Sequence, residues 1–244
     1  MHTNLADPSL DPSLDPSLSQ QLVLLQLADS FFPSGSYTLS HGLESLVHSG
    51  AISSATELET FVRILLCNKV GSTDLVALAH AYRASALADV SEVMAVDARL
   101  FAQTPIEKTR IAARQSGRAL LMVAKETWAH SQLNQLHQAT MDNRFNCLHP
   151  IVFAVVAQIA GLEESSTLAA FIHSFTTGLL GASIRLGVVG HLQVQQIRLS
   201  LKEEMAEVCQ QASVRSLDEM WSCTPTIDIA QMQQAKLSRR LFSS

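Results

Sequence analysis

The sequence predicts a single all-α domain of about ten helices. Apolar residues recur at three- to four-residue spacing through most of the 244 residues, which places them on one face of a helix. Almost no segment alternates between apolar and polar residues, as a half-buried strand would. Helix start and stop signals divide the chain into segments of ordinary helix length. We therefore expect helices packed around one core.

The first 18 residues are expected to have no fold of their own. They contain three copies of Asp-Pro-Ser-Leu, at residues 7–10, 11–14 and 15–18. Because a proline at every fourth position removes backbone donors, this segment cannot form a continuous helix, and its isolated leucines cannot build a core. We predict a flexible, disordered leader over residues 1–18 and a helical domain over residues 19–244.

Four helices are predicted in the N-terminal third of the chain. They are expected at approximately residues 22–29, 40–48, 54–70 and from Ser72 or Thr73 through Tyr82. Gly50 is a good C-terminal cap for the second helix, and Ser54 with Glu57 forms a capping box that opens the third. A hydroxyl at Ser72 or Thr73 would cap the fourth helix, so we expect a break there.

The middle of the chain carries two further start signals. Asp89 with Glu92 is a capping box that leads into an apolar-periodic segment. The clearest signal is at residues 104–107, where Thr-Pro-Ile-Glu supplies an N-cap hydroxyl, a proline at the first helical position and a glutamate at the third. We expect the helix that it opens to run past Trp128.

Three more helices and a tail are predicted towards the C-terminus. The helices are expected from Pro150 to Gly161, from Ser166 or Thr167 through Arg185, and at roughly residues 193–211. Pro225 is expected to break the helical pattern. A tail then spans about residues 224–244.

Composition excludes several classes of protein. The net charge is −5, and the 17 lysines and arginines form no basic stripe, so we expect no nucleic-acid binding. No apolar run reaches the roughly 20 residues that span a bilayer, and no secretory signal is visible. The four cysteines form no C-x-x-C pair, which favours reduced thiols in a cytoplasmic protein. Only 16% of residues are charged, which suggests that a partner covers part of the surface.

The sequence offers no catalytic or metal site. Histidine pairs occur seven residues apart at His41 and His48 and at His130 and His137, but neither pair has a third ligand at helical spacing. No glycine-rich phosphate loop follows a strand, and no G-x-S-x-G elbow is present. We therefore expect no enzyme activity, no cofactor and no resident metal.

The C-terminal residues allow two interpretations. Basic and apolar side chains alternate there: Lys236, Arg239 and Arg240 with Leu237, Leu241 and Phe242. One interpretation is a frayed basic terminus. The other is an amphipathic segment that becomes ordered on a partner, with Leu241 and Phe242 as anchors and arginine as the pairing charge.

Several short blocks, in order, make the chain resemble the UreF family of urease accessory proteins. The blocks are Leu24–Leu27, Pro33, Gly35, Tyr37, Ser40, Gly42–Glu44, Thr104–Glu107, Arg110, Ser116–Leu121, His149–Pro150, Val152–Phe153, Arg185–Leu186, Gly190, Gln195, Pro225, Asp228–Ile229 and Arg240–Phe242. The resemblance extends from about Leu22 to Phe242 and omits only the repeated leader.

The resemblance implies a non-catalytic, all-α protein that forms a homodimer. Such proteins bind the accessory protein UreD, also called UreH, and with it recruit the GTPase UreG, which delivers nickel to the urease apoprotein. The resemblance also implies that GTP hydrolysis is coupled to nickel insertion. The residues it assigns to partner binding are Arg239, Arg240, Leu241 and Phe242 in the tail and Pro33, Gly35 and Tyr37 in a loop.

Two alternative functions remain open at this stage. In the first, the chain is a GTPase-activating regulator that supplies an arginine to UreG, although no arginine has a sequence context that marks it. In the second, it is an unrelated helical enzyme or metal carrier. The sequence also departs from the family pattern, since His41 stands where members usually have glutamine, and the tail lacks a histidine that often occurs near residue 234.

Overall fold

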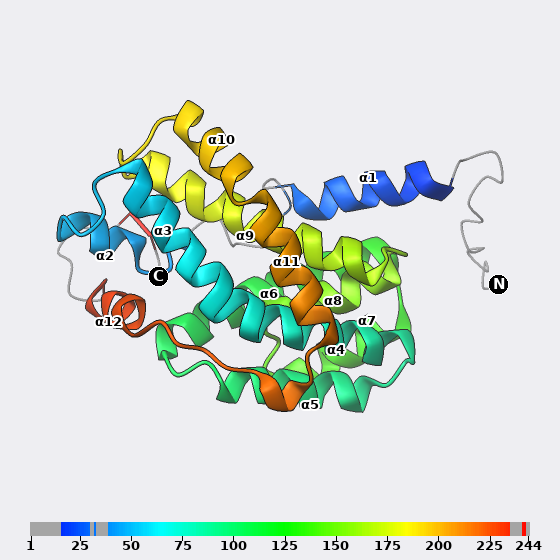
Figure 1. The fold of residues 1–244 in the computed structure, drawn as a ribbon. Helices are drawn as coiled ribbons and strands as arrows, with labels where there is room; N and C mark the ends of the chain where they lie inside the picture. Colours follow the sequence, from blue (N-terminus) through cyan, green and yellow to red (C-terminus); the bar gives the residue numbers. More distant parts are fainter. Residues whose placement is uncertain (1–15, 30–31, 33–38, 235–240, 243–244) are drawn as a thin grey trace, which may run out of the picture.

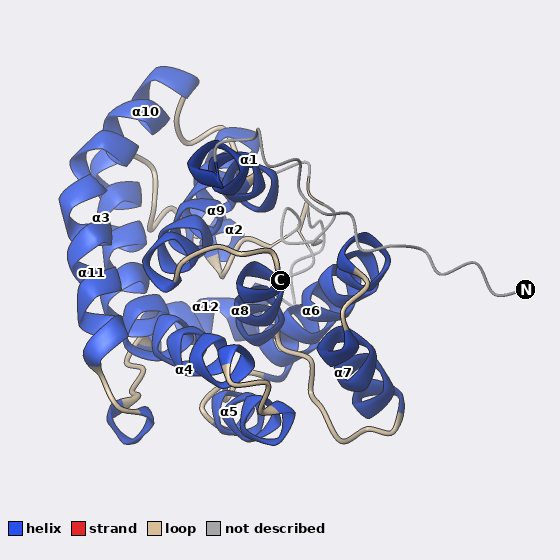
Figure 2. Ribbon diagram, turned by 90° about the vertical axis from the view of Figure 1, so that its right-hand side faces the viewer, coloured by secondary structure: helices blue, strands red, loops and turns tan. Residues whose placement is uncertain are grey.

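The structure, a computed structural model, describes residues 16–29, 32, 39–234 and 241–242. Within these residues every regular element is a helix, and no strand is present (Figure 2). The elements are α1 (Pro16–Ala28), α2 (Leu43–His48), α3 (Ala55–Leu65), the π-helix η2 (Leu66–Asp74), α4 (Leu75–Ala86), α5 (Val90–Ala102), α6 (Glu107–Trp128), α7 (Ser131–Met141), α8 (His149–Ile159), α9 (Glu164–Arg185), α10 (His191–Ser200), α11 (Lys202–Val214), the 3-10 helix η3 (Leu217–Glu219) and α12 (Pro225–Gln234). The all-α class is confirmed.

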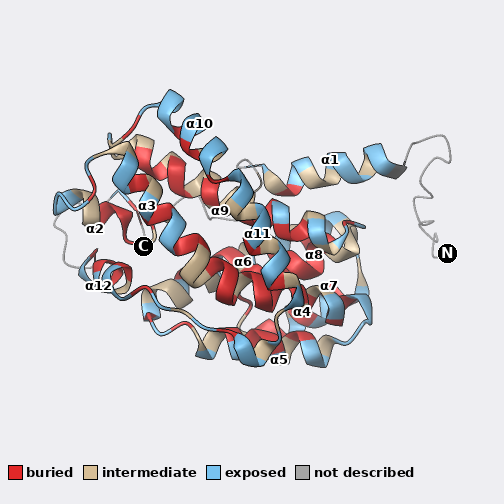
Figure 3. Cartoon of the chain, in the orientation of Figure 1, coloured by how far each residue is buried: buried red, intermediate tan, exposed pale blue. Residues whose placement is uncertain are grey.

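Helix α8 lies at the centre of the molecule (Figure 1). Its residues from Pro150 to Ala157 are all buried, and it packs against α4, α6 and α9. Figure 3 shows the buried residues of α4, α6 and α8 gathered in the middle, with exposed residues on the outer helices. A helix that is apolar on every side requires such a central position, because no face of it is stable in water.

Helix α9 is, among the described residues, the one helix long and apolar enough to cross a membrane. In this fold 56% of its most apolar 18-residue window is buried inside the protein. It packs against α1, α4, α8 and α11, so these helices cover much of its apolar surface.

Several sequence signals are confirmed at the atomic level. The Ser54 hydroxyl accepts a hydrogen bond from the Glu57 amide at 3.3 Å, and the Asp89 carboxylate accepts one from the Glu92 amide at 2.9 Å. Pro150 lies in the first turn of α8, where its missing N–H has no intrahelical partner to lose. Gly161, just after α8, has a φ of +82°. Such a left-handed residue ends a helix at little cost when it is glycine.

Two predicted boundaries in the first half are wrong. The helix that begins at Ala55 does not break at Ser72 or Thr73, because the chain continues through η2 into α4. Thr104 does not cap α6, since its hydroxyl donates instead to the carbonyl of Leu100 at 2.9 Å. The N-cap position of α6 is Ile106, which has no capping side chain.

The remaining differences lie at the two ends of the chain and in α7. Helix α1 begins at Pro16, inside the predicted 1–18 leader, and residues 1–15 lie outside the described residues. Helix α7 was not predicted. The helix expected over residues 193–211 is divided at Leu201 into α10 and α11. Pro225 begins α12 rather than ending the helical pattern, because proline is well suited to a first helical turn.

A buried carboxylate fixes the loop that precedes α8. Asp97 of α5 is fully buried and accepts hydrogen bonds from the backbone amides of Asn146 at 2.7 Å and Leu148 at 2.9 Å. Burial raises the pKa of Asp97, while the backbone donors oppose that increase. The loop also lies close to α6, where a Cβ added to Gly117 would be 1.9 Å from the carbonyl oxygen of Cys147. Only glycine fits that contact.

We expect Gly117→Ala to destabilise the protein by about 1–3 kcal/mol or more, because the loop or α6 must move to admit a methyl group. Chemical denaturation followed by circular dichroism measures the change. Gly178→Ala on α9 is the matched control, since an added Cβ there meets no atom within 4 Å. That control should be neutral or stabilising by up to about 1 kcal/mol. Equal effects of the two substitutions would contradict the close approach of α6 to the loop.

Candidate partner-binding site

The structure describes two of the seven predicted site residues. Leu241 and Phe242 are described, whereas the other five, Pro33, Gly35, Tyr37, Arg239 and Arg240, lie outside the described residues. The residues next to both predicted segments are nevertheless in place, because Leu39 and Ser40 follow the first and Gln234 precedes the second.

Glu44 lies between described residues that flank the two segments. It lies in the first turn of α2, two residues after Gly42, whose φ of +85° lets the chain turn into the helix. A Cβ on Gly42 would be 3.1 to 3.3 Å from Gln231 and Ile227 of α12, so the turn also permits α12 to approach α2 closely. As a result, Glu44 is only 4% exposed although it carries a carboxylate.

Both carboxylate oxygens of Glu44 accept hydrogen bonds from the C-terminal part of the chain. The backbone N–H of Leu241 donates to Oε1 at 2.6 Å, and the side-chain amide of Gln234 donates to Oε2 at 2.9 Å. The same amide group contacts the hydroxyl of Ser40 at 3.2 Å. Charge-assisted hydrogen bonds of this kind are stronger than neutral ones. Ser40, Glu44, Gln234 and Leu241 therefore form one connected set of hydrogen bonds.

The last two described residues have opposite exposures. Phe242 is 5% exposed, and the guanidinium carbon of Arg185, at the end of α9, lies 4.6 Å from the centre of its ring. Leu241 is 71% exposed. We name the set of Glu44, Arg185 and Gln234 the tail receptor.

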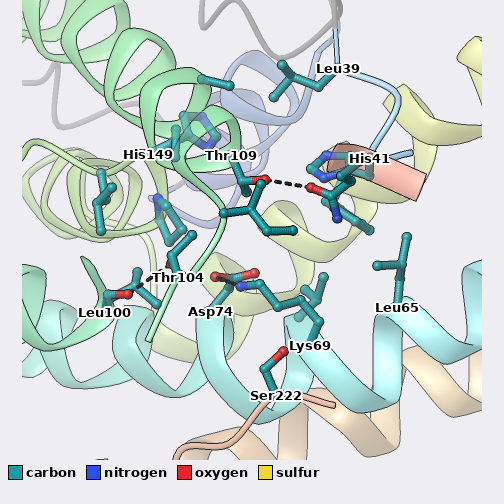
Figure 4. A pocket seen from close by; sticks show the side chains of 18 of the residues that line it. Leu39, His41, Leu65, Lys69, Asp74, Leu100, Thr104, Thr109, His149 and Ser222 are labelled. Atoms are coloured by element: carbon teal, nitrogen blue, oxygen red, sulfur yellow. Dashed lines mark hydrogen bonds and ion pairs between the residues drawn. The ribbon is translucent and has the colours of Figure 1, made fainter. Parts of the chain in front are cut away.

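A cavity of about 120 Å³ lies beside α12 (Figure 4). Its wall is mainly apolar, with the Lys69–Asp74 ion pair at 2.8 Å and the hydrogen bond from the Thr109 hydroxyl to Gln231 at 2.5 Å as polar features. His41 and His149 also line it. The cavity extends from η2 to α12 and so reaches the helix that bears the tail.

Burial keeps both cavity histidines uncharged at neutral pH. It lowers the pKa of His41 to about 4, with a smaller effect of the Lys69 charge, and it lowers the pKa of His149 to about 4. The His149 ring packs near Phe153 and Phe171, and its Nε2 has no hydrogen-bond partner among the residues that the structure describes. Among the described residues no group of three His, Cys, Asp or Glu side chains could hold a metal ion.

The π-helix η2 holds the segment that leads into α12. The backbone amides of Trp221 and Cys223 donate to the carbonyls of Ser72 at 3.2 Å and Asn68 at 3.0 Å. The Thr73 hydroxyl donates to the Trp221 carbonyl at 2.6 Å. A π-helix often marks a functional position. Here its carbonyls and one hydroxyl fix the start of α12.

Sequence reasoning did not identify the tail receptor. Glu44 and Arg185 each belong to a block that carried the family resemblance, but neither was assigned to the site. A signal was available for Glu44, since an acidic residue in a short apolar helix is costly to bury without a donor. The identity of that donor was not accessible, because Leu241 lies 197 residues away in the sequence.

We predict that stability falls between pH 7.5 and pH 5, because the two cavity histidines bind protons in the unfolded chain but not in the folded one. Folding lowers the pKa of each histidine from 6.5 to about 4. The free energy of unfolding is therefore highest above pH 6.5, where both imidazoles are neutral in the folded and the unfolded chain, and it decreases as the pH falls from 6.5 towards 4. Each histidine accounts for up to about 2 kcal/mol at pH 5. Urea denaturation at the two pH values measures the loss.

Replacing His41 should reduce this pH dependence. His41→Gln removes one titrating group and should make the loss smaller by up to about 2 kcal/mol. The matched control is His48→Gln, on the exposed end of α2, which should leave the loss unchanged. An unaltered pH dependence in His41→Gln would mean that His41 titrates as it does in the unfolded chain.

Comparison with known proteins identifies the relatives of this chain. The family model described as UreF matches residues 52–202. A urease accessory protein UreF of Trichodesmium erythraeum (strain IMS101) is 50% identical over 226 residues, which cover 93% of this chain and 97% of that protein. UreF proteins of Actinobacillus pleuropneumoniae and Azorhizobium caulinodans are 30% and 28% identical and cover 91% and 87% of this chain. The chain belongs to the UreF family of urease accessory proteins.

Proposed function

We propose that the chain is a urease maturation factor that bridges UreD (UreH) and the GTPase UreG, so that GTP hydrolysis is coupled to nickel insertion into the urease apoprotein. Membership of the UreF family supports the role in urease maturation. One observation supports the finer proposal: Ser40, which follows the first predicted partner-binding segment, is linked through Gln234 to Glu44, which also binds Leu241 of the second. A loop and a tail that are far apart in sequence can then contribute to one surface.

The outer side of the C-terminal part supports a protein partner. Three large apolar side chains there are more than half exposed: Ile229 at 54%, Met232 at 55% and Leu241 at 71%. Exposed apolar side chains at one end of a chain with few charges are typical of a surface that another protein covers. The proposal assigns this surface to UreD.

The proposal includes a homodimer in the cytoplasm and no catalytic activity of the chain itself. These parts come from the resemblance to the UreF family. A second apolar surface is compatible with more than one protein contact, because Leu18, Leu22 and Leu25 of α1 are 50–65% exposed at helical spacing.

Deletion of residues 235–244 is expected to abolish co-purification with UreD. The deletion keeps α12, whose Gln231 bonds to Thr109 and whose Gln234 bonds to Glu44, so the helical fold should remain. Pull-down with tagged UreD measures binding, and far-UV circular dichroism measures the fold. Deletion of residues 1–15 is the control, since it removes a longer segment outside the proposed surface. Undiminished co-purification of the 235–244 deletion would contradict the assignment of the tail.

The alternative, an arginine supplied to UreG, has one candidate that the structure favours. Arg118 of α6 is exposed and makes no hydrogen bond or ion pair with the described residues, whereas Arg99 pairs with Asp218. If Arg118 acts as an arginine finger, Arg118→Ala should lower the UreG GTPase rate in the complex by about 10³-fold or more. Arg99→Ala is the control and should have no such effect. A rate within twofold of the unmodified complex would exclude Arg118, and the same result for every other arginine variant would end this alternative.

A further inference from the structure

The Leu241 backbone amide, the Leu241 side chain and the Phe242 side chain have different environments, although the sequence predicts one role for both residues. The Leu241 backbone amide and the Phe242 side chain both contact the chain's own residues, namely Glu44 and Arg185. The Leu241 side chain points to solvent with 71% of its surface exposed. Two neighbouring residues of the same apolar class therefore have opposite environments.

The buried carboxylate of Glu44 favours the docked position of Leu241, because it needs hydrogen-bond donors from the protein. Glu44 is 4% exposed, so its carboxylate has lost most of its water and depends on donors from the protein. Among the described residues, the donors to this carboxylate are the amides of Gln234 and Leu241. Removal of Leu241 from the receptor would leave Oε1 without its donor in a buried place, which is unfavourable.

The contact between Arg185 and Phe242 adds to the same docking. A guanidinium over an aromatic face within about 6 Å is an attractive arrangement, and it is stronger when water is excluded. Phe242 is 5% exposed here, so its ring is removed from water on nearly all sides. The aromatic side chain thus has the environment of a core residue, although it lies at the end of the chain.

We propose that Phe242 and the Leu241 backbone anchor the tail to the tail receptor, and that the Leu241 side chain is the part of this dipeptide that faces the partner. The second half of this inference rests on the proposed function, whereas the first concerns the isolated chain. It revises the expectation that Leu241 and Phe242 are equivalent anchors in a partner. Phe242 becomes a positioning residue, and it acts on the partner through Leu241.

Trypsin cleavage of the full-length, isolated protein tests the anchor. Lys236, Arg239 and Arg240 provide trypsin sites directly before the docked dipeptide, and intact-mass spectrometry follows the loss of the C-terminus. We expect Phe242→Ala to be cleaved about tenfold faster than the unmodified chain, because the local docking equilibrium limits access. Leu241→Ala keeps the backbone amide and should be cleaved at the unmodified rate.

Glu44→Gln tests the same anchor from the receptor side. The substitution keeps the size of the side chain but removes the charge and introduces an amide NH₂ group among donors, so cleavage should again be faster. Phe242 packs at the edge of the buried core and Glu44 is also buried, so circular dichroism verifies that both variants keep the helical fold. An unmodified cleavage rate in both Phe242→Ala and Glu44→Gln would overturn the anchor. Equal cleavage rates of Leu241→Ala and Phe242→Ala, both faster than the unmodified chain, would also overturn the anchor.

Pull-down with tagged UreD tests the partner-facing half. Leu241→Ala should weaken UreD binding by about tenfold or more, as removal of a central apolar contact does, while its cleavage rate stays unmodified. Undiminished binding by Leu241→Ala, together with loss of binding by the 235–244 deletion, would overturn the role of Leu241 and leave the proposed function intact. Undiminished binding by the deletion as well would overturn the tail assignment of the proposed function, with the anchor still decided by the trypsin result.

Discussion

The fold depends on the buried carboxylate of Asp97. By accepting the amides of Asn146 and Leu148, it determines where the loop ends and α8 begins, and α8 is the helix on which α4, α6 and α9 pack. Ionising a carboxyl group in an apolar interior is unfavourable, so the backbone donors are required for the group to be accommodated. The same loop also packs closely against α6, because Gly117 has no side chain to contact the Cys147 carbonyl oxygen. Two hydrogen bonds to one buried carboxylate therefore help to position the central helix of the core.

Glu44 repeats this arrangement at the other end of the molecule. It too is a buried carboxylate whose acceptor atoms are satisfied by amides from a distant segment. The difference lies in the donors, because those of Asp97 belong to a loop enclosed by helices, whereas one donor of Glu44 belongs to the end of the chain. The first contact is fully enclosed by the fold. The second can break when the C-terminal segment alone detaches from Glu44, which suits a surface that binds other proteins.

The sequence was sufficient for the class of the fold and for the features that depend on neighbouring residues. Capping by Ser54 and Asp89 follows from side chains three residues from their donors, and these predictions were right. Thr104 shows the limit of the same reasoning, since its hydroxyl had a competing acceptor in the preceding helix. The continuation through η2 was not predictable, because the carbonyls of this π-helix are used by Trp221, about 150 residues later. The tail receptor escaped prediction for the same physical reason.

The pairing of η2 with residues 221–223 also constrains how the chain length can vary among relatives. Trp221 and Cys223 are two residues apart and donate to Ser72 and Asn68, which are four residues apart in η2, so the two hydrogen bonds fix the length of chain between them. An extra residue at 222 would disrupt this pairing, whereas residues added near Arg215, before η3, would be accommodated as a longer loop. The connection between α11 and α12 therefore acts as a spacer of fixed length at one end and tolerates insertion at the other.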